Sequence, residues 1–395
     1  MIQVRKRNSR SGTLCNHPWV LNQLSLKVGM QAEPLFGQNL DELTSTVGGD
    51  NRRARQLWRA LYRDRIAGLD PLAARLRALL PGDAEVGLPA IAQTAVSVDG
   101  TERYLMRLAD GETIETVWMP EGEADDFDGH DLRNRGRLAG QGYQRATICI
   151  SSQVGCAVNC QFCLTAKLGV KRNLTAGEIA GQVALVLNRH QIRVGVDRIN
   201  LVLMGMGEPF LNYDAVMKAI GLIVQGIGIP ASRITVSTSG IEPAIRRFAA
   251  ETIRPNLALS LNAPNDVIRE QVMPINRKWK IAELLEAVKT IPLGKRGWIN
   301  VEYVLLGGVN DQPEHALQVL ELLRDVQAKV NLIVWNPGPG IAYRQPEPAD
   351  VTRFHRILVD NGMPTFTRRP RGRDIYAACG QLKRTLEEPE LVALG

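Results

Sequence analysis

From residue 146 onwards, short apolar segments alternate with longer stretches in which apolar residues recur at helical spacing. This alternation is typical of βα units that build a parallel sheet. The clearest helix is expected after Thr175, because Glu178 can complete a capping box and Ile179, Val183 and Val186 then share one face. The expected strands are 147–150, 199–204, 234–236, 257–261, 299–306, 331–334 and 365–367. We therefore predict an α/β fold, with a parallel (βα) barrel or open, partial barrel over residues 146–385.

Two other patterns precede this core. Leucines recur among many arginines between residues 41 and 80, which predicts a small helical domain over 31–93. Its arginine-rich faces are either solvated or turned towards a polyanion. Apolar and polar residues alternate between 94 and 118 around the turn pairs Asp99-Gly100 and Asp110-Gly111, which predicts a β-meander in an extension over 94–145. Residues 122–145 are expected to form a flexible insertion. At the two ends of the chain we expect a basic extension (1–30) and a tail (386–395).

Composition places the chain among ordinary globular proteins. It has 395 residues, of which 45% are hydrophobic and 23% charged. Uncharged runs are broken by Gly and Pro, and the basic start lacks a following apolar run, so we expect neither a membrane span nor a secretory signal. A cytoplasmic location is predicted, where cysteines bind metals or react rather than form structural bridges. A net charge of +7 favours a polyanionic partner.

Three of the six cysteines, Cys156, Cys160 and Cys163, lie in a Cys-x3-Cys-x2-Cys spacing after the first expected core strand. Three thiolates on one loop can hold three irons of a 4Fe-4S cluster, leaving the fourth iron open to a chelating molecule such as S-adenosylmethionine. A structural zinc site would need a fourth ligand, and the five histidines are scattered singly. Zinc binding and simple packing of free cysteines remain the alternatives.

Together with other motifs, this cysteine loop resembles the RlmN family of radical S-adenosylmethionine methyltransferases. The resemblance covers residues 40–385, and the further motifs are Met204-Gly-Met-Gly-Glu-Pro, Ser237-Thr-Ser-Gly, Ala263-Pro-Asn, Pro274-Ile-Asn and Ala378-Cys-Gly-Gln-Leu. It implies a radical S-adenosylmethionine partial barrel that methylates C2 of an adenine in 23S rRNA and in tRNA. The related Cfr family, which methylates C8 of adenine, is the alternative.

The resemblance also implies the cofactors and their ligands. Cys156, Cys160 and Cys163 would hold one 4Fe-4S cluster, and two S-adenosylmethionine molecules would be used in each turnover. The residues implied to contact S-adenosylmethionine are Gly207, Glu208, Ser237, Ser260, Leu261, Asn262 and Asn336. Glu208 can pair with its ammonium group, and Ser and Asn side chains can hydrogen-bond its ribose and base. Asn262 departs from the family's usual histidine.

Two distant cysteines carry the implied chemistry. Cys379 would accept a methyl group, become bonded through it to the adenine, and be released by Cys149 through a transient disulfide. Glu115 matches the family's proton acceptor, although by itself it would be interpreted as a solvated strand carboxylate. Arg373 departs from the acidic residue usual at its position. The implied partners are 23S rRNA, tRNA and an electron donor such as flavodoxin or ferredoxin. The protein itself is expected to be a monomer that does not associate with a membrane.

Overall fold

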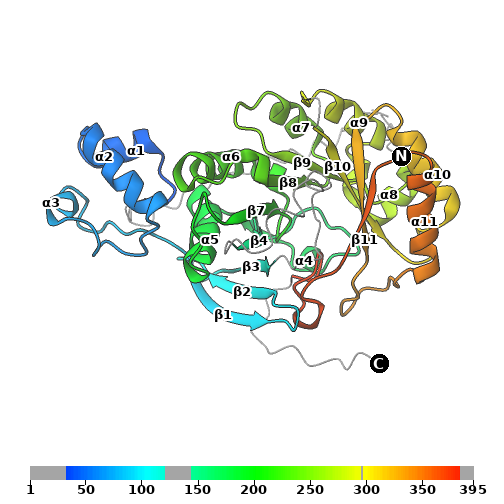
Figure 1. Cartoon of the computed structure of the whole chain (residues 1–395), viewed down its shortest axis with the longest axis horizontal. Coiled ribbons are helices and arrows are strands. Elements are labelled where there is room, and N and C mark those ends of the chain that lie inside the picture. Colours follow the sequence, from blue (N-terminus) through cyan, green and yellow to red (C-terminus); the bar gives the residue numbers. More distant parts are fainter. Residues whose placement is uncertain (1–32, 121–143, 295–296, 383–395) are drawn as a thin grey trace, which may run out of the picture.

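The protein is built on one ten-stranded sheet. A computed structural model describes residues 33–120, 144–294 and 297–382. The strand order is β1-β2-β3-β4-β7-β8-β9-β10-β11-β12, and every pairing from β4 to β12 is parallel (Figure 1). The parallel strands are β4 (Arg145–Cys149), β7 (Arg198–Leu203), β8 (Ile234–Thr238), β9 (Asn256–Ser260), β10 (Ile299–Leu305), β11 (Ala328–Val334) and β12 (Thr365–Arg368). All seven expected core strands are therefore confirmed.

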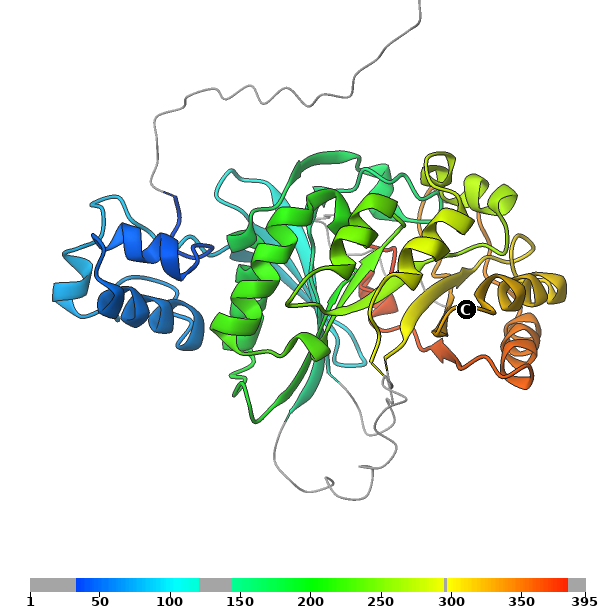
Figure 2. The same cartoon turned by 90° about the horizontal axis from the view of Figure 1, so that it is seen from above.

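The sheet follows chain order and is open, because β1 and β12 are its two edges among the described strands. Helices lie between successive parallel strands and cover the outer face of the sheet (Figure 2). They are α5 (Ala176–Arg189), α6 (Tyr213–Gly221), α7 (Glu242–Ala249), α8 (Asp266–Val272), α9 (Ile281–Lys289), α10 (Pro313–Leu323) and α11 (Pro348–Asp360). The capping box expected at α5 is present, with Glu178 N donating to Thr175 Oγ1 at 3.1 Å and Thr175 N donating to Glu178 Oε2 at 2.8 Å. The predicted α/β open barrel is confirmed.

The expected β-meander extends the parallel sheet on its N-terminal side. Strands β1 (Ala90–Val96), β2 (Glu102–Arg107) and β3 (Thr113–Pro120) pair antiparallel with one another. β3 also pairs antiparallel with β4, which places Val117 opposite Cys149 and Met119 opposite Thr147. The meander thus aligns its third strand with the first strand of the barrel.

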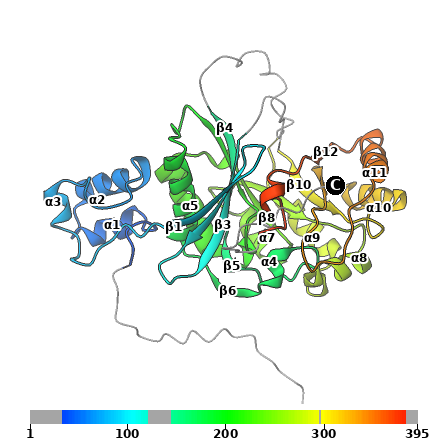
Figure 3. The same ribbon diagram turned by 90° about the horizontal axis from the view of Figure 1, so that it is seen from below.

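Helices also form in the N-terminal region, as expected from its leucine pattern. They are α1 (Leu40–Thr46), α2 (Asn51–Trp58) and α3 (Ala74–Arg77), and they lie beyond α5 at one end of the molecule (Figure 3). A π-helical turn at Arg59–Arg63 follows α2 and packs against a second one at Leu222–Ile227. Tyr62 anchors the chain entering α1, donating to Gln38 O at 2.7 Å. The basic extension, most of the 122–145 insertion and the C-terminal tail lie outside the described residues.

Candidate active site

The cysteine loop is held by a small hairpin that sequence patterns did not predict. Strands β5 (Gln153–Gly155) and β6 (Val170–Asn173) form a separate two-stranded sheet, and the helix α4 (Leu164–Lys167) follows the third cysteine. Cys156 N donates to Gly169 O at 2.9 Å, which fixes the start of the loop. Gly155 has φ +85°, and a Cβ built on it would lie 1.8 Å from Gly169 O. Only glycine therefore fits at position 155, where the backbone passes close to Gly169.

All three loop cysteines border one cavity, which we call the cysteine-loop cavity. The other lining residues come largely from the carboxyl ends of β7, β8, β9 and β10, where a parallel barrel carries its functional groups. They include Gly205, Gly207, Glu208, Ser237, Ser239, Ser260, Asn262, Glu302 and Cys379. The cavity therefore joins the cysteines to most of the residues implied to contact S-adenosylmethionine.

The three loop thiols are shielded from water by the protein around them. Burial is the main cause that raises their pKa, for Cys156 to about 12, and the neighbouring thiols raise the pKa of Cys160 further. Within the described residues no three Cys, His, Asp or Glu side chains surround a point where a single metal ion could sit. A cubane cluster needs no such point, because each cysteine binds a different iron. The three thiols line one cavity, where they would bind the cluster that the sequence predicts.

Glu208 lies buried at the wall of this cavity with one face held by the backbone. Its carboxylate accepts from Ser239 N at 2.7 Å and from Phe210 N at 3.0 Å. Burial raises the pKa of Glu208, while these two hydrogen bonds act in the opposite direction. A cationic group such as an ammonium would favour the ionised carboxylate.

The remaining residues implied to contact S-adenosylmethionine fall into two groups. Ser237 and Ser260 line the cysteine-loop cavity and lie 3.3 Å apart through their hydroxyl oxygens. Asn262 also lines it, with φ +56° and its Oδ1 accepting from Val304 N at 2.9 Å. Leu261 is fully buried and does not itself line this cavity, although Ser260 and Asn262 on either side of it do. Asn336 lines the adjacent cavity instead. Asn262 thus already uses its side chain to support the backbone.

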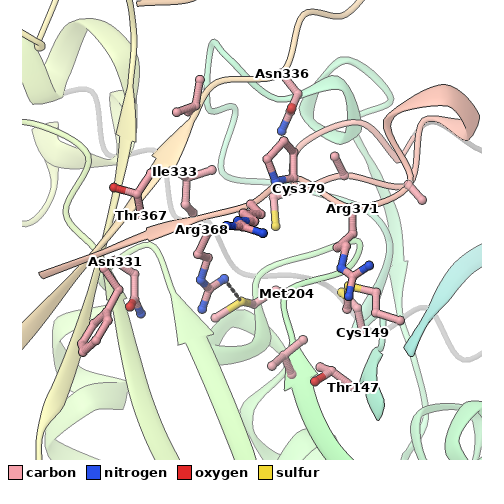
Figure 4. A pocket seen from close by; sticks show the side chains of 18 of the residues that line it. Thr147, Cys149, Met204, Asn331, Ile333, Asn336, Thr367, Arg368, Arg371 and Cys379 are labelled. Atoms are coloured by element: carbon pink, nitrogen blue, oxygen red, sulfur yellow. Dashed lines mark hydrogen bonds between the residues drawn. The ribbon is translucent and has the colours of Figure 1, made fainter. Parts of the chain in front are cut away.

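A second cavity, the thiol cavity, lies beside the first. Cys149, at the end of β4, and Cys379 both line it, together with Thr147, Met204, Asn331 and Arg368 (Figure 4). Burial and the neighbouring Cys379 raise the pKa of the Cys149 thiol, whereas Cys379 itself is exposed to the cavity. Cys379 lines both cavities. It is therefore placed to face the cysteine loop on one side and Cys149 on the other.

An ion pair joins the walls of the two cavities. Arg368 lines the thiol cavity and donates from Nη2 to Glu302 Oε1 at 3.0 Å, while Glu302 lines the cysteine-loop cavity. Both side chains are largely buried, at 14% and 4% exposed. Arg368 favours the thiolate forms of Cys149 and Cys379, against the burial that raises both pKa values.

Several buried oxygens at these cavities have no hydrogen-bond partner within the described chain. They are Ser239 Oγ and Glu302 Oε2 at the cysteine-loop cavity and Asn336 Oδ1 at the thiol cavity. Buried polar atoms are normally satisfied. A polar ligand with hydroxyl and amino groups, as S-adenosylmethionine has, would supply donors where these acceptors lie.

Glu115 lies on β3, on the same face of the strand as Val117 and Met119 because side chains alternate. Val117 is paired with Cys149, so this face continues the wall that carries the thiol. The Glu115 carboxylate is fully buried and lies 3.2 Å from Arg103 Nη1. It does not line either cavity. Its proposed part in proton transfer stays a prediction.

The loop that carries Cys379 is tied down on both sides. Asp374 accepts from Ser97 Oγ at 2.5 Å, and Gly372 N donates to Asp99 Oδ2 at 3.0 Å. Ser97 and Asp99 belong to the turn between β1 and β2. Beyond the cysteine, Gly380 O accepts from Leu164 N at 2.8 Å. Arg373, where the family usually has an acid, is exposed. The loop thus joins the meander to the cysteine loop.

Comparison with known proteins decides the family. The Radical SAM superfamily profile matches residues 150–323. The chain is 53% identical over 88% of its length to "Probable dual-specificity RNA methyltransferase RlmN" of Koribacter versatilis, covering 99% of that protein. This chain belongs to the RlmN family. The RlmN protein of Geobacter sulfurreducens is 41% identical over 89% of this chain and 92% of its own length. The crystal structure of a radical SAM methyltransferase from Sphaerobacter thermophilus matches 90% of this chain and 100% of that one, with a TM-score of 0.79 at 37% identity.

Membership of the RlmN family confirms the α/β radical SAM core, and with it the expectation of a 4Fe-4S cluster and S-adenosylmethionine as cofactors. It also favours the RlmN interpretation over the Cfr alternative. No helix in the described ranges is long and apolar enough to cross a membrane.

The structure of this RlmN-family chain also reveals functional candidates that sequence reasoning missed. They are Ser239, Glu302 and Arg269, which border the site or its supports. Their hydrogen-bond partners lie 31, 66 and up to 30 residues away in sequence. Ser239 belongs to the Ser237-Thr-Ser-Gly motif, so its place in that motif could have marked it as a site residue. Glu302 and Arg269 carry no such local signal.

Proposed function

We propose that this chain is a radical S-adenosylmethionine methyltransferase that methylates C2 of adenine in 23S rRNA and in tRNA. The observation that carries the proposal is the position of Cys379, which lines both the cysteine-loop cavity and the thiol cavity. A methyl-carrying residue needs access to the methyl donor and to the acceptor base. The RlmN relatives named above are dual-specificity RNA methyltransferases.

The chain's own residues have distinct proposed roles. Cys156, Cys160 and Cys163 would hold the cluster, which when bound supplies the electron that cleaves S-adenosylmethionine. Glu208 would orient the ammonium group of S-adenosylmethionine through a carboxylate that the backbone already fixes. The unpartnered oxygen of Ser239 would accept a further hydrogen bond from the ligand.

Cys379 and Cys149 would divide the covalent work. The Cys379 thiolate attacks the donor methyl group, so a carbon–sulfur bond forms and the sulfonium sulfur leaves with the electron pair of the broken bond. With the cofactors bound, one hydrogen atom would be removed from this carbon before it bonds to C2 of adenine. The Cys149 thiolate would then attack the Cys379 sulfur. A disulfide forms, the carbon–sulfur bond breaks, and its electrons remain on the carbon, which takes up a proton. Arg368 lies beside both thiols and favours their ionised forms. Glu115 is proposed to accept the proton lost from C2.

The surroundings of the site accord with an RNA partner. Arg369 and Arg371 line the thiol cavity beside the buried Arg368 and would meet phosphates near the target base. We propose that the protein works in the cytoplasm as a monomer and receives electrons from a flavodoxin or ferredoxin. Residues 31–93 are proposed to be an accessory domain, and 94–145 an extension of the radical SAM core at 146–385.

Anaerobic reconstitution tests the function directly. The purified chain is loaded with iron and sulfide, reduced, and incubated with S-adenosylmethionine and with 23S rRNA or tRNA lacking the modification. The RNA is then digested and its adenosines are compared with 2-methyladenosine and 8-methyladenosine standards. We expect 2-methyladenosine. The C8 product would show Cfr chemistry instead, and RNA binding without any methylated adenosine would indicate a binding protein.

A further inference from the structure

A fully buried arginine lies under the cysteine-loop cavity. Arg269 belongs to α8, the short helix that follows the β9 end of the barrel, and it has 0% exposed surface. It is the largest side chain among those with almost no exposed surface in the described chain. A buried guanidinium is costly unless it is hydrogen-bonded and its charge is balanced.

The hydrogen bonds of Arg269 go to neutral oxygens. Its Nε donates to Leu261 O at 3.0 Å, and its Nη2 donates to Ser239 O at 2.6 Å and Ser260 O at 3.1 Å. Its Nη1 donates to Asn276 Oδ1 at 2.9 Å. These four bonds use four of the five N–H donors of the guanidinium but leave its charge without a hydrogen-bonded carboxylate among the described residues.

The acid three positions earlier does not supply this carboxylate. Asp266 Oδ1 accepts from Asn276 Nδ2 at 2.9 Å and from Ile281 N at 3.0 Å. Asp266 acts on Arg269 through its charge alone, without a hydrogen bond between the two side chains. Burial lowers the pKa of Arg269 to about 10, so the side chain remains cationic at neutral pH. The helix that carries this cation also touches the cysteine loop, because Gln161 N, next to Cys160, donates to Val272 O at the end of α8 at 2.9 Å.

The same guanidinium fixes two strand ends. Ser239 O, which accepts from Arg269, belongs to the residue whose N–H holds Glu208 Oε2 at 2.7 Å. Ser260 O belongs to the last residue of β9, and Leu261 O to the residue that follows the strand. Arg269 therefore sets the spacing between the ends of β8 and β9, the two segments that carry Ser237, Ser260 and Asn262 into the cavity.

We propose that Arg269 is a positioning residue with two effects on the cofactors: its charge balances the anionic cluster held by the cysteine loop, and its hydrogen bonds hold the β8 and β9 ends on which S-adenosylmethionine rests. This inference deepens the proposed function and rests on it. A fixed positive charge near a cluster stabilises its reduced, more negative form.

Charge and hydrogen bonding are separated by two variants of the reconstituted holoenzyme. Arg269→Gln removes the charge, whereas Arg269→Lys keeps a charge but cannot make the same set of bonds. Arg277→Gln is the matched control, because it removes one charge from a 73% exposed side chain close by in sequence. The readouts are the midpoint reduction potential of the cluster, the dissociation constant for S-adenosylmethionine and the thermal unfolding midpoint.

We expect Arg269→Gln to shift the potential to a more negative value and Arg269→Lys to keep it near that of the control. Both should weaken S-adenosylmethionine binding, by about tenfold for the loss of one charged hydrogen bond. An Arg269→Gln protein with the potential and affinity of the control, changed only in its unfolding midpoint, would reduce Arg269 to a packing role. If Arg269→Gln does not fold, Arg269→Lys decides: a shifted potential with unchanged affinity would overturn the inference. Failure of the wild-type chain to bind a cluster would instead reject the proposed function.

Discussion

Glu302 and Arg368 connect the two cavities of the active site through one hydrogen bond of 3.0 Å. The carboxylate faces the cysteine-loop cavity and keeps one oxygen unpartnered there, whereas the guanidinium lies beside the two reactive thiols. A ligand that donates to the free oxygen of Glu302 would therefore touch the same carboxylate that positions the cation of the thiol cavity.

Replacing Arg368 should consequently slow the reactions of Cys379. In Arg368→Gln the cation that favours the thiolate is lost, so the pKa of Cys379 rises and its thiolate fraction at pH 8 falls. We expect alkylation of Cys379 by iodoacetamide to slow by about tenfold, since an opposite charge nearby shifts a pKa by about one unit or more. Arg369→Gln, an exposed side chain on the same cavity, is the control and should leave the rate unchanged. Equal slowing in both would deny Arg368 a specific role.

The same change should cost stability. Breaking a largely buried pair leaves Glu302 without its cation, and such losses amount to about 3 kcal/mol. Urea unfolding of Arg368→Gln and of Arg369→Gln would measure the difference between the two free energies of unfolding. A difference near zero would mean that Asn331, which donates to Glu302 Oε1 at 2.9 Å, suffices for that carboxylate.

The two thiols should differ in reactivity, and both should react faster as the pH rises. Burial raises the pKa of the Cys149 thiol, and the protein around the sulfur of Cys379 raises its pKa as well, although solvent reaches that side chain. Below a thiol's pKa its thiolate fraction grows about tenfold for each unit of pH, so alkylation should accelerate throughout the range from 7 to 9. Cys379 is exposed and Cys149 only 7% exposed, so Cys379 should be labelled first. Peptide mass spectrometry of cluster-free protein follows both; a Cys149 rate that levels off below pH 9 would contradict the raised pKa.

Cys149→Ala should trap the reaction half-way. Methylation of Cys379 and bonding to adenine need no thiol at 149, whereas release does. We expect a covalent protein–RNA adduct, visible as a slow RNA-bearing band in a denaturing gel. The double variant with Cys379→Ala is the control and should show no such band, because no carbon bridge can form. A Cys149→Ala enzyme that turns over normally would refute the release step.

Gly155→Ala should disrupt the cysteine loop beyond the ordinary cost of its backbone conformation. Its Cβ would lie 1.8 Å from Gly169 O, whereas Gly111, with φ +84°, has open space around its Cβ. Gly111→Ala should therefore cost about 1–2 kcal/mol from the left-handed conformation alone. Gly155→Ala should cost more and also lower the iron and sulfide bound on reconstitution. Full iron content in Gly155→Ala would show that the crossing of β5 and β6 does not set the loop.

The barrel and the cysteine loop could be predicted because their signals are local. Strand and helix periodicity located all seven parallel strands, and the spacing of Cys156, Cys160 and Cys163 was readable within one loop. The hairpin β5–β6 was missed because its strands have only three and four residues. Strands this short carry too few positions for a recognisable alternation.

The electrostatics of the site could not be predicted, because they depend on contacts between distant segments. Arg269 stands in a polar-looking helix, Asp266–Val272, where an arginine would be expected at the surface. Its burial follows only from the way the ends of β8 and β9 fold over it. The role of Glu115 differs again: its place in the sequence resembles the family pattern, but its ion pair with Arg103 requires the β2–β3 register.

The anchoring of the Cys379 loop has a consequence for how the chain folds. Asp374 bonds to Ser97 across 277 residues of sequence, so the segment that follows the last strand is linked to the first turn of the meander. Closing a loop of this length before the intervening strands have formed is entropically unfavourable and slow. During synthesis, moreover, the segment around Cys379 leaves the ribosome after the rest of the barrel. We therefore expect the methyl-accepting thiol to reach its position last, onto a scaffold that has already folded.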